Sequence, residues 1–374
     1  MTWGRLLAIL GCGLFLTIAL AVSVVFLASG PALTTTGFPS LPQDGETPAV
    51  QKIFISGHSL TDRPMPEMLA TIAEDTGQPI IWNMQHIGGS SIKQRSYGAG
   101  DQSPWSGYGG GTDREGAPID VQDELAASAS EDTRPYDVLL ITEQHRLLDS
   151  LLWQDTPRFL RAYQDVFHAH NPDGQSYFYA PWLDVANLED LSSWIAYERN
   201  AWPVWQCAVA GVNAGLAEDG REDRIMLVPA SLALADLVEH LVSTPGGLPG
   251  FKNMAAAEIL AALFSDSVHL TPLGNSYMAA IVYATLTGNP IPATEFANFS
   301  GAQVATLQNI ANEFMETYRR EMSTFGDGCA AKVAPSFKIA YPAYTEQLSR
   351  NQGTGFLSAR LQRLKETLSY LRKL

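Results

Sequence analysis

The sequence predicts an α/β protein with a mostly parallel sheet, preceded by an N-terminal transmembrane helix. From about residue 50 to 290, short apolar runs typical of buried strands alternate with longer runs of helical periodicity. Such alternation favours a parallel sheet with helices on both faces. The N-terminal region differs, because Leu6–Ala28 (LLAILGCGLFLTIALAVSVVFLA) is one unbroken apolar stretch.

Residues 1–30 are predicted to be a signal anchor. A bilayer core needs about 20 apolar residues, which Leu6–Ala28 supplies. Arg5 precedes this stretch and the next charged residue is Asp44, so the positive-inside rule places the N-terminus in the cytoplasm and the rest outside. This predicts a single-pass protein of a bacterial inner membrane whose main domain lies in the periplasm. A cleaved signal peptide and a secreted product remain the alternative.

Residues 31–49 are rich in Pro, Thr and Gly and are predicted to be a flexible linker. The net charge of −15 argues against nucleic acid or an anionic membrane surface as a partner, because both require basic patches. Cys207 and Cys329 are the cysteines outside the anchor, and whether they form a disulfide or two buried thiols stays open.

The α/β domain is assigned to residues 50–290. Strands are predicted at Lys52–Ser56, Pro79–Asn83, Tyr136–Thr142, Ser176–Ala180 and Arg224–Pro229. Helices are predicted at Met65–Thr76, Ile119–Ala129, Pro157–His170, Leu188–Gly215 (with breaks), Leu232–Val242 and Pro272–Leu286. Ligands of such sheets bind outside the carboxyl ends of the strands. We therefore expect the polar residues that follow the strands to converge at one edge.

Residues 291–374 are predicted to be a C-terminal helical extension. It comprises a helix over Ala302–Ser323, irregular chain over Phe325–Tyr344, and a helix over Gly355–Leu374. In the last helix, five leucines at helical spacing lie opposite a face rich in Lys and Arg. The leucines are Leu357, Leu361, Leu364, Leu368 and Leu371. We expect this helix to pack on the domain, with a partner-binding or membrane-surface helix as the alternative.

The first informative stretch is KIFISGHSLTD, in which Ser59 follows the first predicted strand directly. One interpretation is a capping box, with Ser59 as the cap and Asp62 reaching back. The other is a nucleophile at a strand-to-helix turn, with its hydroxyl exposed above the sheet. The second informative stretch bears on this choice.

SDSVHLTPLG, residues 265–274, ends in Thr271-Pro272, a typical helix start. Asp266 and His269 therefore lie in the loop before that helix, where the carboxylate can accept the ring N–H of the imidazole. Such a contact fixes the tautomer and stabilises the imidazolium formed when a histidine takes a proton from a nucleophile.

Gly-x-Ser-Leu after the first strand and Asp-x-x-His before the last helix resemble the SGNH, or GDSL, hydrolase superfamily. The resemblance implies a flavodoxin-like three-layer α/β/α fold and a serine esterase without a cofactor. It makes Ser59 the nucleophile, His269 the base and Asp266 its orienting acid. In NMQHIGGSS, Gly89 or Gly88 matches the glycine that donates to the oxyanion.

Two positions differ from the family pattern. His58 stands where an aspartate usually lies between the glycine and the serine. After the third strand the chain reads Thr142-Glu143-Gln144-His145, without the usual asparagine. Gln144 aligns best with that residue, and its amide is expected to supply a similar donor to the oxyanion hole.

A Gly-rich loop between residues 96 and 119 is too long for a simple connection and is expected to lie over the site. Its Trp105 and Tyr108, together with Trp182, are predicted to stack on sugar rings. No metal site is predicted, because His58, His86 and His145 lack the spacing of a ligand set.

The sequence thus predicts a membrane-anchored serine hydrolase that removes O-acyl groups, in particular acetyl groups, from a polysaccharide. An accessory role in exopolysaccharide secretion, cellulose for instance, is an extension by analogy. A polysaccharide O-acyltransferase with the same triad is a close variant. The rival from another class is a non-catalytic glycan-binding or scaffold protein on the same fold. A lipase is disfavoured, because nothing near the site predicts a large apolar groove.

Overall fold

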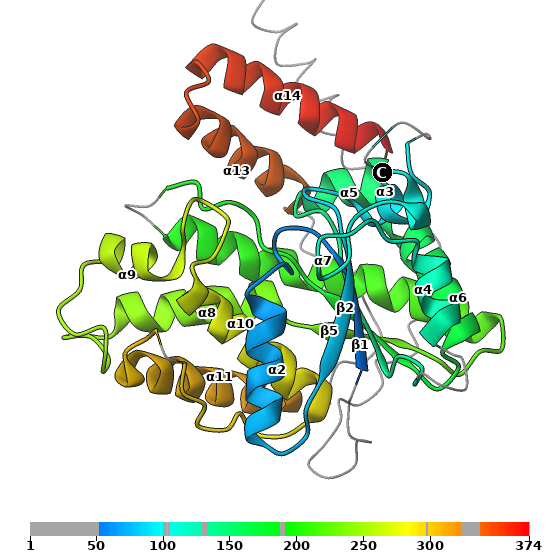
Figure 1. The fold of residues 1–374 in the computed structure, drawn as a ribbon. Coiled ribbons are helices and arrows are strands. Elements are labelled where there is room, and N and C mark those ends of the chain that lie inside the picture. The colour runs from blue at the N-terminus through cyan, green and yellow to red at the C-terminus, as the bar shows by residue number, and fades with distance from the viewer. Residues whose placement is uncertain are drawn as a thin grey trace, which may run out of the picture. The chain divides into compact units, whose positions relative to one another are not determined.

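The structure is a computed structural model that describes residues 52–99, 103, 105–128, 134–187, 191–296, 298–322 and 337–373. Its centre is a sheet of five parallel strands in the order β2-β1-β3-β4-β5 (Figure 1). The strands are β1 (Lys52–Gly57), β2 (Ile81–His86), β3 (Val138–Thr142), β4 (Gln175–Tyr179) and β5 (Ile225–Val228). The predicted α/β class with a parallel sheet is confirmed. The strand order is that of flavodoxin-like doubly wound folds.

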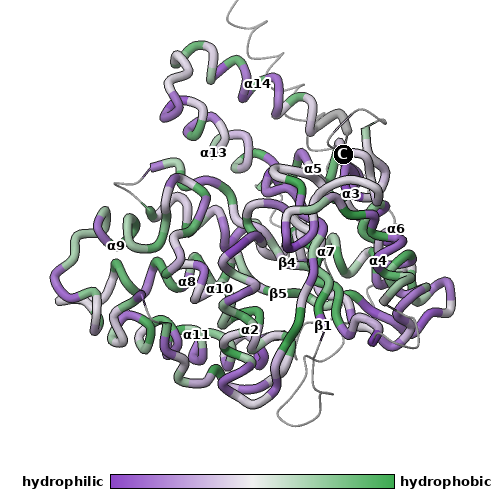
Figure 2. Tube along the Cα trace, in the orientation of Figure 1, coloured by the Kyte–Doolittle hydropathy of each residue, from purple (hydrophilic) through white to green (hydrophobic). Residues whose placement is uncertain are grey.

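Helices cover the sheet on both faces. The strand order reverses direction after β2, so right-handed connections put α2 (Met65–Asp75) on one face and the helices that follow β2, β3 and β4 on the other. α10 (Pro272–Thr287) packs beside α2. The other face carries α4 (Val121–Ser128), α6 (Thr156–His170) and α7 (Ser192–Glu218). In Figure 2 the hydrophobic colour runs along β1 and recurs on the flanking helices.

The remaining helices of the domain are short or peripheral. They are α3 (Ile92–Ser96), the 3₁₀ turn η1 (Gly107–Gly109), α5 (Leu147–Trp153), α8 (Ala230–Ser243) and α9 (Ala256–Leu263). α3, α5 and α9 were not predicted, because helices of five to eight residues show too little periodicity. α7 was predicted with breaks but is one helix with Pro203 inside it.

The hydrophobic core is built from residues that range along the sequence from Ile53 to Tyr370. Every residue of β3 is buried, and in α10 only Pro272 and Asn275 are not. A helix that is hydrophobic on all sides is usually buried, and α10 contains no charged residue. Thr35–Leu374 forms one compact unit that contains this whole core, so it has the core it needs to fold without residues 1–34.

The C-terminal extension contains α11 (Gly301–Met322), α13 (Phe337–Asn351) and α14 (Phe356–Lys373). The prediction of irregular chain up to Tyr344 is wrong from Phe337 onward. Pro342 lies inside α13, and Phe337, Tyr341 and Tyr344 share one helical face and pack on Tyr197. α14 packs on α13, as expected of a helix on the domain, although Leu357, Leu361, Leu364 and Leu368 are exposed.

The predicted anchor and linker, residues 1–49, lie outside the described residues, as does Cys329. Among the helices that the structure describes, none has the length and hydropathy of a membrane span. Cys207 is disulfide-bonded.

Candidate active site

Ser59 occupies an exposed turn at the carboxyl end of β1. The turn is closed by Thr61, whose N–H and hydroxyl both donate to the His58 carbonyl, at 2.9 and 3.2 Å. A Cβ on Gly57 would meet the Thr61 hydroxyl at 1.8 Å, so only glycine allows this close approach. The turn holds the Ser59 side chain in solvent above the sheet.

The capping-box interpretation of Ser59 is wrong. Helix α2 begins at Met65 after Pro64, and no side chain caps it. Asp62 accepts a hydrogen bond from the N–H of Arg63 instead of reaching back to Ser59. Ser59 is therefore free to serve another role.

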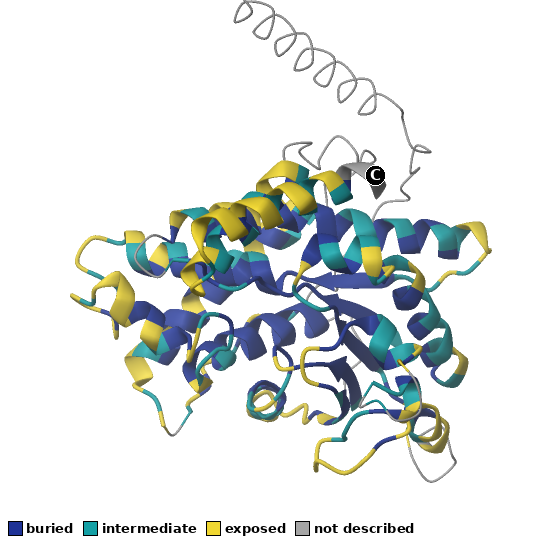
Figure 3. Ribbon diagram, turned by 90° about the horizontal axis from the view of Figure 1, so that it is seen from above, coloured by how far each residue is buried: buried dark blue, intermediate teal, exposed yellow. Residues whose placement is uncertain are grey.

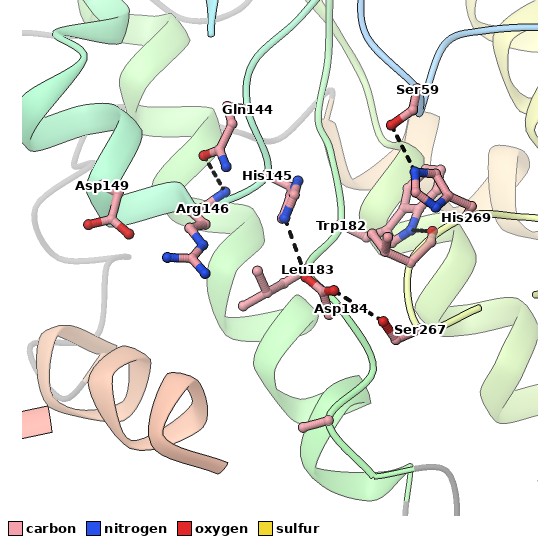
Figure 4. A network of polar contacts seen from close by, with 12 residues as sticks. Ser59, Gln144, His145, Arg146, Asp149, Trp182, Leu183, Asp184, Ser267 and His269 are labelled. Atoms are coloured by element: carbon pink, nitrogen blue, oxygen red, sulfur yellow. Dashed lines mark hydrogen bonds and ion pairs between the residues drawn. The ribbon is translucent and has the colours of Figure 1, made fainter. Parts of the chain in front are cut away.

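The Ser59 hydroxyl contacts His269, and His269 contacts Asp266. Ser59 Oγ and His269 Nε2 are 2.9 Å apart, and His269 Nδ1 and Asp266 Oδ2 are 2.6 Å apart (Figure 4). The three residues thus form one hydrogen-bonded chain in the order nucleophile, base and acid. The arrangement brings together positions 210 residues apart in the sequence.

The Asp266 carboxylate is fixed by its own loop. Its Oδ1 accepts hydrogen bonds from the backbone N–H groups of Val268 (2.8 Å) and His269 (2.7 Å). Partial burial raises the pKa of Asp266, but the hydrogen bonds from the His269 ring and these two N–H groups outweigh it and lower the pKa below its usual value. The carboxylate therefore stays ionised over a wide pH range. The side chains of His269 and Asp266 are 43% and 52% exposed, so the pair is open to solvent.

Trp182 supports this loop from beneath. It is 1% exposed, and its indole N–H donates to the Val268 carbonyl at 2.8 Å. A buried ring has no face available for a sugar, so the predicted stacking role does not fit this structure. Trp182 instead positions the loop that carries Asp266 and His269.

Gly88 and Gly89 form an exposed turn after β2, closed by the hydrogen bond from the Ser90 N–H to the Ile87 carbonyl. Gly89 has a φ of 67°, which favours glycine. Within the described residues, neither glycine N–H donates to another group, so both are available to a ligand.

Gln144 turns away from Ser59. Its amide oxygen accepts the backbone N–H of Arg146 at 3.0 Å, and Figure 4 shows the side chain directed toward Arg146. The amide oxygen is therefore engaged at the start of α5 in this structure, whereas the donor to an oxyanion would be the amide NH₂ group. One extra methylene, compared with asparagine, allows the side chain to fold back on its own loop.

A buried polar layer lies beneath the site. Arg95 donates to the Ser56 hydroxyl (2.9 Å) and to the Ser90 carbonyl (2.9 Å), and it also contacts the Thr142 carbonyl. Glu143 accepts the N–H groups of Ile92 (3.0 Å) and Gln144 (2.7 Å). This layer ties together the loops that follow β1, β2 and β3.

His58 takes part in the same layer as a neutral side chain. Burial, together with the nearby Arg95 charge, lowers the pKa of His58 to about 3. Its Nε2 lies 2.9 Å from the Glu143 carbonyl, and its Nδ1 accepts the Leu60 N–H, which fixes the tautomer. The unusual histidine thus braces the turn that carries Ser59.

Two parts of this edge were not predicted. His145 Nε2 lies 3.3 Å from Asp184 Oδ2, and the Ser267 hydroxyl donates to Asp184 Oδ1 at 3.2 Å (Figure 4). The signal that could have pointed to Asp184 is its place in the loop after β4, two residues beyond Trp182. A pocket of about 370 Å³ also lies beside the Gly89 turn, lined by Gly89, Ser91, Gln94, Gln144, Arg146, Asp149, Trp153 and Gln154.

The Gly-rich loop is packed against the domain. The side chain of Gln85 donates to the carbonyls of Gly107 and Gly110, both at 2.9 Å. Tyr108 packs on Tyr163 with ring centroids 5.2 Å apart, and Trp105 is half-buried. In the described residues, no hydrogen bond or ring contact joins Trp105 or Tyr108 to the triad.

No group of histidine, cysteine and acidic side chains suited to a metal ion occurs in the described part of the chain. His86 pairs with Asp62 at 3.6 Å and His145 with Asp184, so these histidines have separate partners.

No protein-family model matches the chain, and no curated protein is similar to it. A DUF4886 family protein from Bacteroides uniformis has a similar structure, with a TM-score of 0.49 and 13% identity, covering 72% of this chain and 96% of that one. A putative GDSL-like lipase from Parabacteroides merdae has a TM-score of 0.37 and 15% identity, covering 67% of this chain and 99% of that one.

Proposed function

We propose that the protein is a serine esterase of the SGNH type, with Ser59 as nucleophile, His269 as base and Asp266 as orienting acid. The observation that carries the proposal is the hydrogen-bonded chain from Ser59 through His269 to Asp266. A serine hydroxyl is a weak nucleophile until an adjacent base accepts its proton. His269 is placed to do so, with its other nitrogen held by a carboxylate.

The reaction proceeds through an acyl-enzyme. His269 Nε2 takes the hydroxyl proton as Ser59 Oγ attacks the ester carbonyl, and Asp266 stabilises the imidazolium. The N–H groups of Gly88 and Gly89 are the proposed donors to the oxyanion. The imidazolium then protonates the leaving alcohol, and water, activated by the same histidine, releases the acid.

The proposed substrate is an O-acylated polysaccharide, with acetyl as the acyl group. The pocket beside Gly89 supports this, because amides, a guanidinium, a carboxylate and the half-exposed Trp153 line it. Such groups suit sugar hydroxyls and one sugar face rather than an acyl chain. Trp153 thus takes the stacking role predicted for Trp182, and Trp105 and Tyr108 remain candidates for a more distant contact.

We further propose that residues 1–30 anchor the enzyme in a bacterial inner membrane, with the α/β domain in the periplasm beside a polysaccharide secretion system. The apolar stretch Leu6–Ala28 supports the anchor. The same triad would serve an O-acyltransferase if a second sugar in the pocket accepted the acyl group instead of water.

A non-catalytic glycan-binding protein is the second candidate, and the orientation of Gln144 favours it. The Gln144 amide oxygen accepts the Arg146 N–H, so the side chain is directed toward α5 and not toward Ser59. Loss of one oxyanion donor costs about 10²–10³ in rate, which slows an esterase but leaves glycan binding unchanged.

Hydrolysis of p-nitrophenyl acetate by residues 35–374 tests the proposal. Ser59→Ala and His269→Ala should each lower kcat by about 10³-fold or more, as expected for residues that act as a unit. His240→Gln is the matched control, because His240 is an exposed histidine on α8 and should leave the rate unchanged.

Wild-type turnover no faster than that of Ser59→Ala would contradict the esterase. Binding of an acetylated polysaccharide that survives in Ser59→Ala, without any acetate release by the wild type, would establish the binding protein instead. Acetate transfer to an added oligosaccharide, in place of release, would identify the transferase.

A further inference from the structure

The C-terminal hairpin, defined as α13 and α14 (residues 337–373), has a charge opposite to that of the chain as a whole. It contains seven Lys and Arg residues and two Glu residues, a net charge of +5 in a chain of net charge −15. The acidity of the whole sequence argued against an anionic partner. The hairpin is a local exception to that argument.

Helix α14 packs through one face and leaves its leucines on the other. Ala359 and Tyr370 are 0% and 1% exposed and face the protein. The leucine stripe, defined as Leu357, Leu361, Leu364 and Leu368, is 74%, 67%, 56% and 47% exposed. Figure 3 shows this outer side of α14 in yellow, above the dark blue sheet.

The leucine stripe is continuous and flanked by basic residues. Spacings of four, three and four residues keep its members on one side of a helix with 3.6 residues per turn. On the helical wheel, Arg360 and Lys365 stand on either side of the stripe, and both are exposed. Arg363 lies nearer the packed face, and both arginines pair with Glu346, Arg363 at 3.0 Å and Arg360 at 3.4 Å.

We propose that α14 lies on the surface of an anionic lipid bilayer, with the leucine stripe in the interface. A helix with an outward apolar face and basic residues along its borders is the form that binds in the plane of such an interface. The net positive charge of the hairpin matches anionic headgroups. The leucines distinguish a bilayer from an anionic polymer, which has no apolar interior to receive them.

This surface is joined to the candidate active site. Tyr370 and Tyr341 donate to the Asp149 carboxylate on α5, at 3.2 and 3.4 Å, and Asp149 lines the pocket beside Gly89. Tyr344 donates to the Asp184 carbonyl at 2.9 Å. Docking of α14 therefore holds the carboxyl edge of the sheet close to the membrane, whatever reaction occurs there.

Vesicle co-sedimentation of residues 35–374 tests the proposal without the apolar N-terminal stretch. The probes are vesicles of phosphatidylcholine alone and of phosphatidylcholine mixed with phosphatidylglycerol. The variant Leu361→Gln/Leu364→Gln removes two exposed leucines but keeps good helix formers. Ile81→Thr is the matched control, because Ile81 is a 56% exposed apolar side chain at the start of β2.

The wild type and Ile81→Thr should bind the anionic vesicles and not the neutral ones. The double variant should bind at least about tenfold more weakly, from the loss of buried CH₂ groups. Lys365→Gln should weaken binding about fivefold, and added salt should weaken it further. Circular dichroism should show the same thermal transition for all variants.

Equal binding of the wild type and the double variant, or no preference for anionic vesicles, would overturn the proposal. A second result would also overturn it: the wild type forms a concentration-dependent dimer in analytical ultracentrifugation, the double variant does not, and neither protein binds vesicles. That result would make a second copy of the chain the partner of the leucine stripe. Full-length protein in proteoliposomes should show hydrogen exchange in α14 that slows only when the lipid is anionic.

Discussion

At the residue scale, the loop that carries Asp266 and His269 rests on the buried Trp182, whose indole N–H donates to the Val268 carbonyl at 2.8 Å. Ser59, His269 and Asp266 were predicted to lie together because each is tied to a strand end or a helix start, and the structure places them in one hydrogen-bonded chain. Gln144 and Trp182 were also placed at the correct edge. Their orientations depend on partners that no local pattern reveals, namely Arg146 for the amide and Val268 for the buried indole.

Trp182→Phe should lower kcat/KM for p-nitrophenyl acetate by about tenfold and the stability by about 1–2 kcal/mol. The change leaves the buried Val268 carbonyl without its donor and loosens the loop that holds Asp266 and His269. Steady-state kinetics and urea unfolding give the two quantities.

Trp194→Phe is the control for this effect. Trp194 is also buried and donates to a backbone carbonyl, that of Leu183, at 2.8 Å. The Trp194→Phe variant should lose a similar free energy of unfolding, but its kcat/KM should fall less than that of Trp182→Phe. Equal losses of rate in the two variants would show that the Trp182 effect is only general destabilisation.

At the element scale, helices with local start and stop signals were predicted closely. α10 begins at Pro272 after the cap Thr271 and ends at Thr287, one residue beyond the predicted end. It is followed by the cap Gly288, which has a φ of 74°. α13 could not be predicted in the same way. Its helical state depends on the packing of its aromatic face against Tyr197 of α7, a contact between distant parts of the chain.

Tyr344→Phe tests how far α13 supports the site. The Tyr344 hydroxyl donates to the Asp184 carbonyl (2.9 Å) and accepts the Ala186 N–H (3.0 Å). Its removal leaves two buried backbone groups unpaired, at a cost of about 1–3 kcal/mol each. We expect a lower midpoint in urea unfolding and faster hydrogen exchange at residues 183–186. A midpoint equal to that of the wild type would mean that water replaces the hydroxyl.

At the scale of the whole molecule, the alternation of strands and helices was sufficient for the fold class. It fixes which elements are buried on both faces, and right-handed crossovers then determine the layers. The net charge was less informative, because a sum over 374 residues hides the basic hairpin. Buried titratable groups were not predicted either, since their burial exists only in the assembled fold.

Two of these groups set the pH range of stability from opposite sides. The pKa of His58 is lowered to about 3 in the folded protein, so as the pH falls His58 is protonated in the unfolded chain before it is protonated in the folded one. Stability is therefore lost as the pH falls from about 6.5 toward 3. Burial raises the pKa of Glu198 well above its usual value, so the folded chain retains a proton that the unfolded chain releases. Stability is then lost as the pH rises above about 4.3.

Glu198→Gln should therefore stabilise the protein at pH 8, by on the order of 1–2 kcal/mol, and should have little effect at pH 4. Glutamine mimics the protonated carboxyl, is not ionised in the unfolded chain, and keeps an oxygen to accept the Leu183 N–H that Glu198 accepts at 2.7 Å. Thermal unfolding of both proteins between pH 4 and 8 measures the difference. A gap in Tm that widens with rising pH is the expected result. A variant less stable than the wild type at pH 8 would show instead that Glu198 is ionised in the fold, with a charge that the protein compensates.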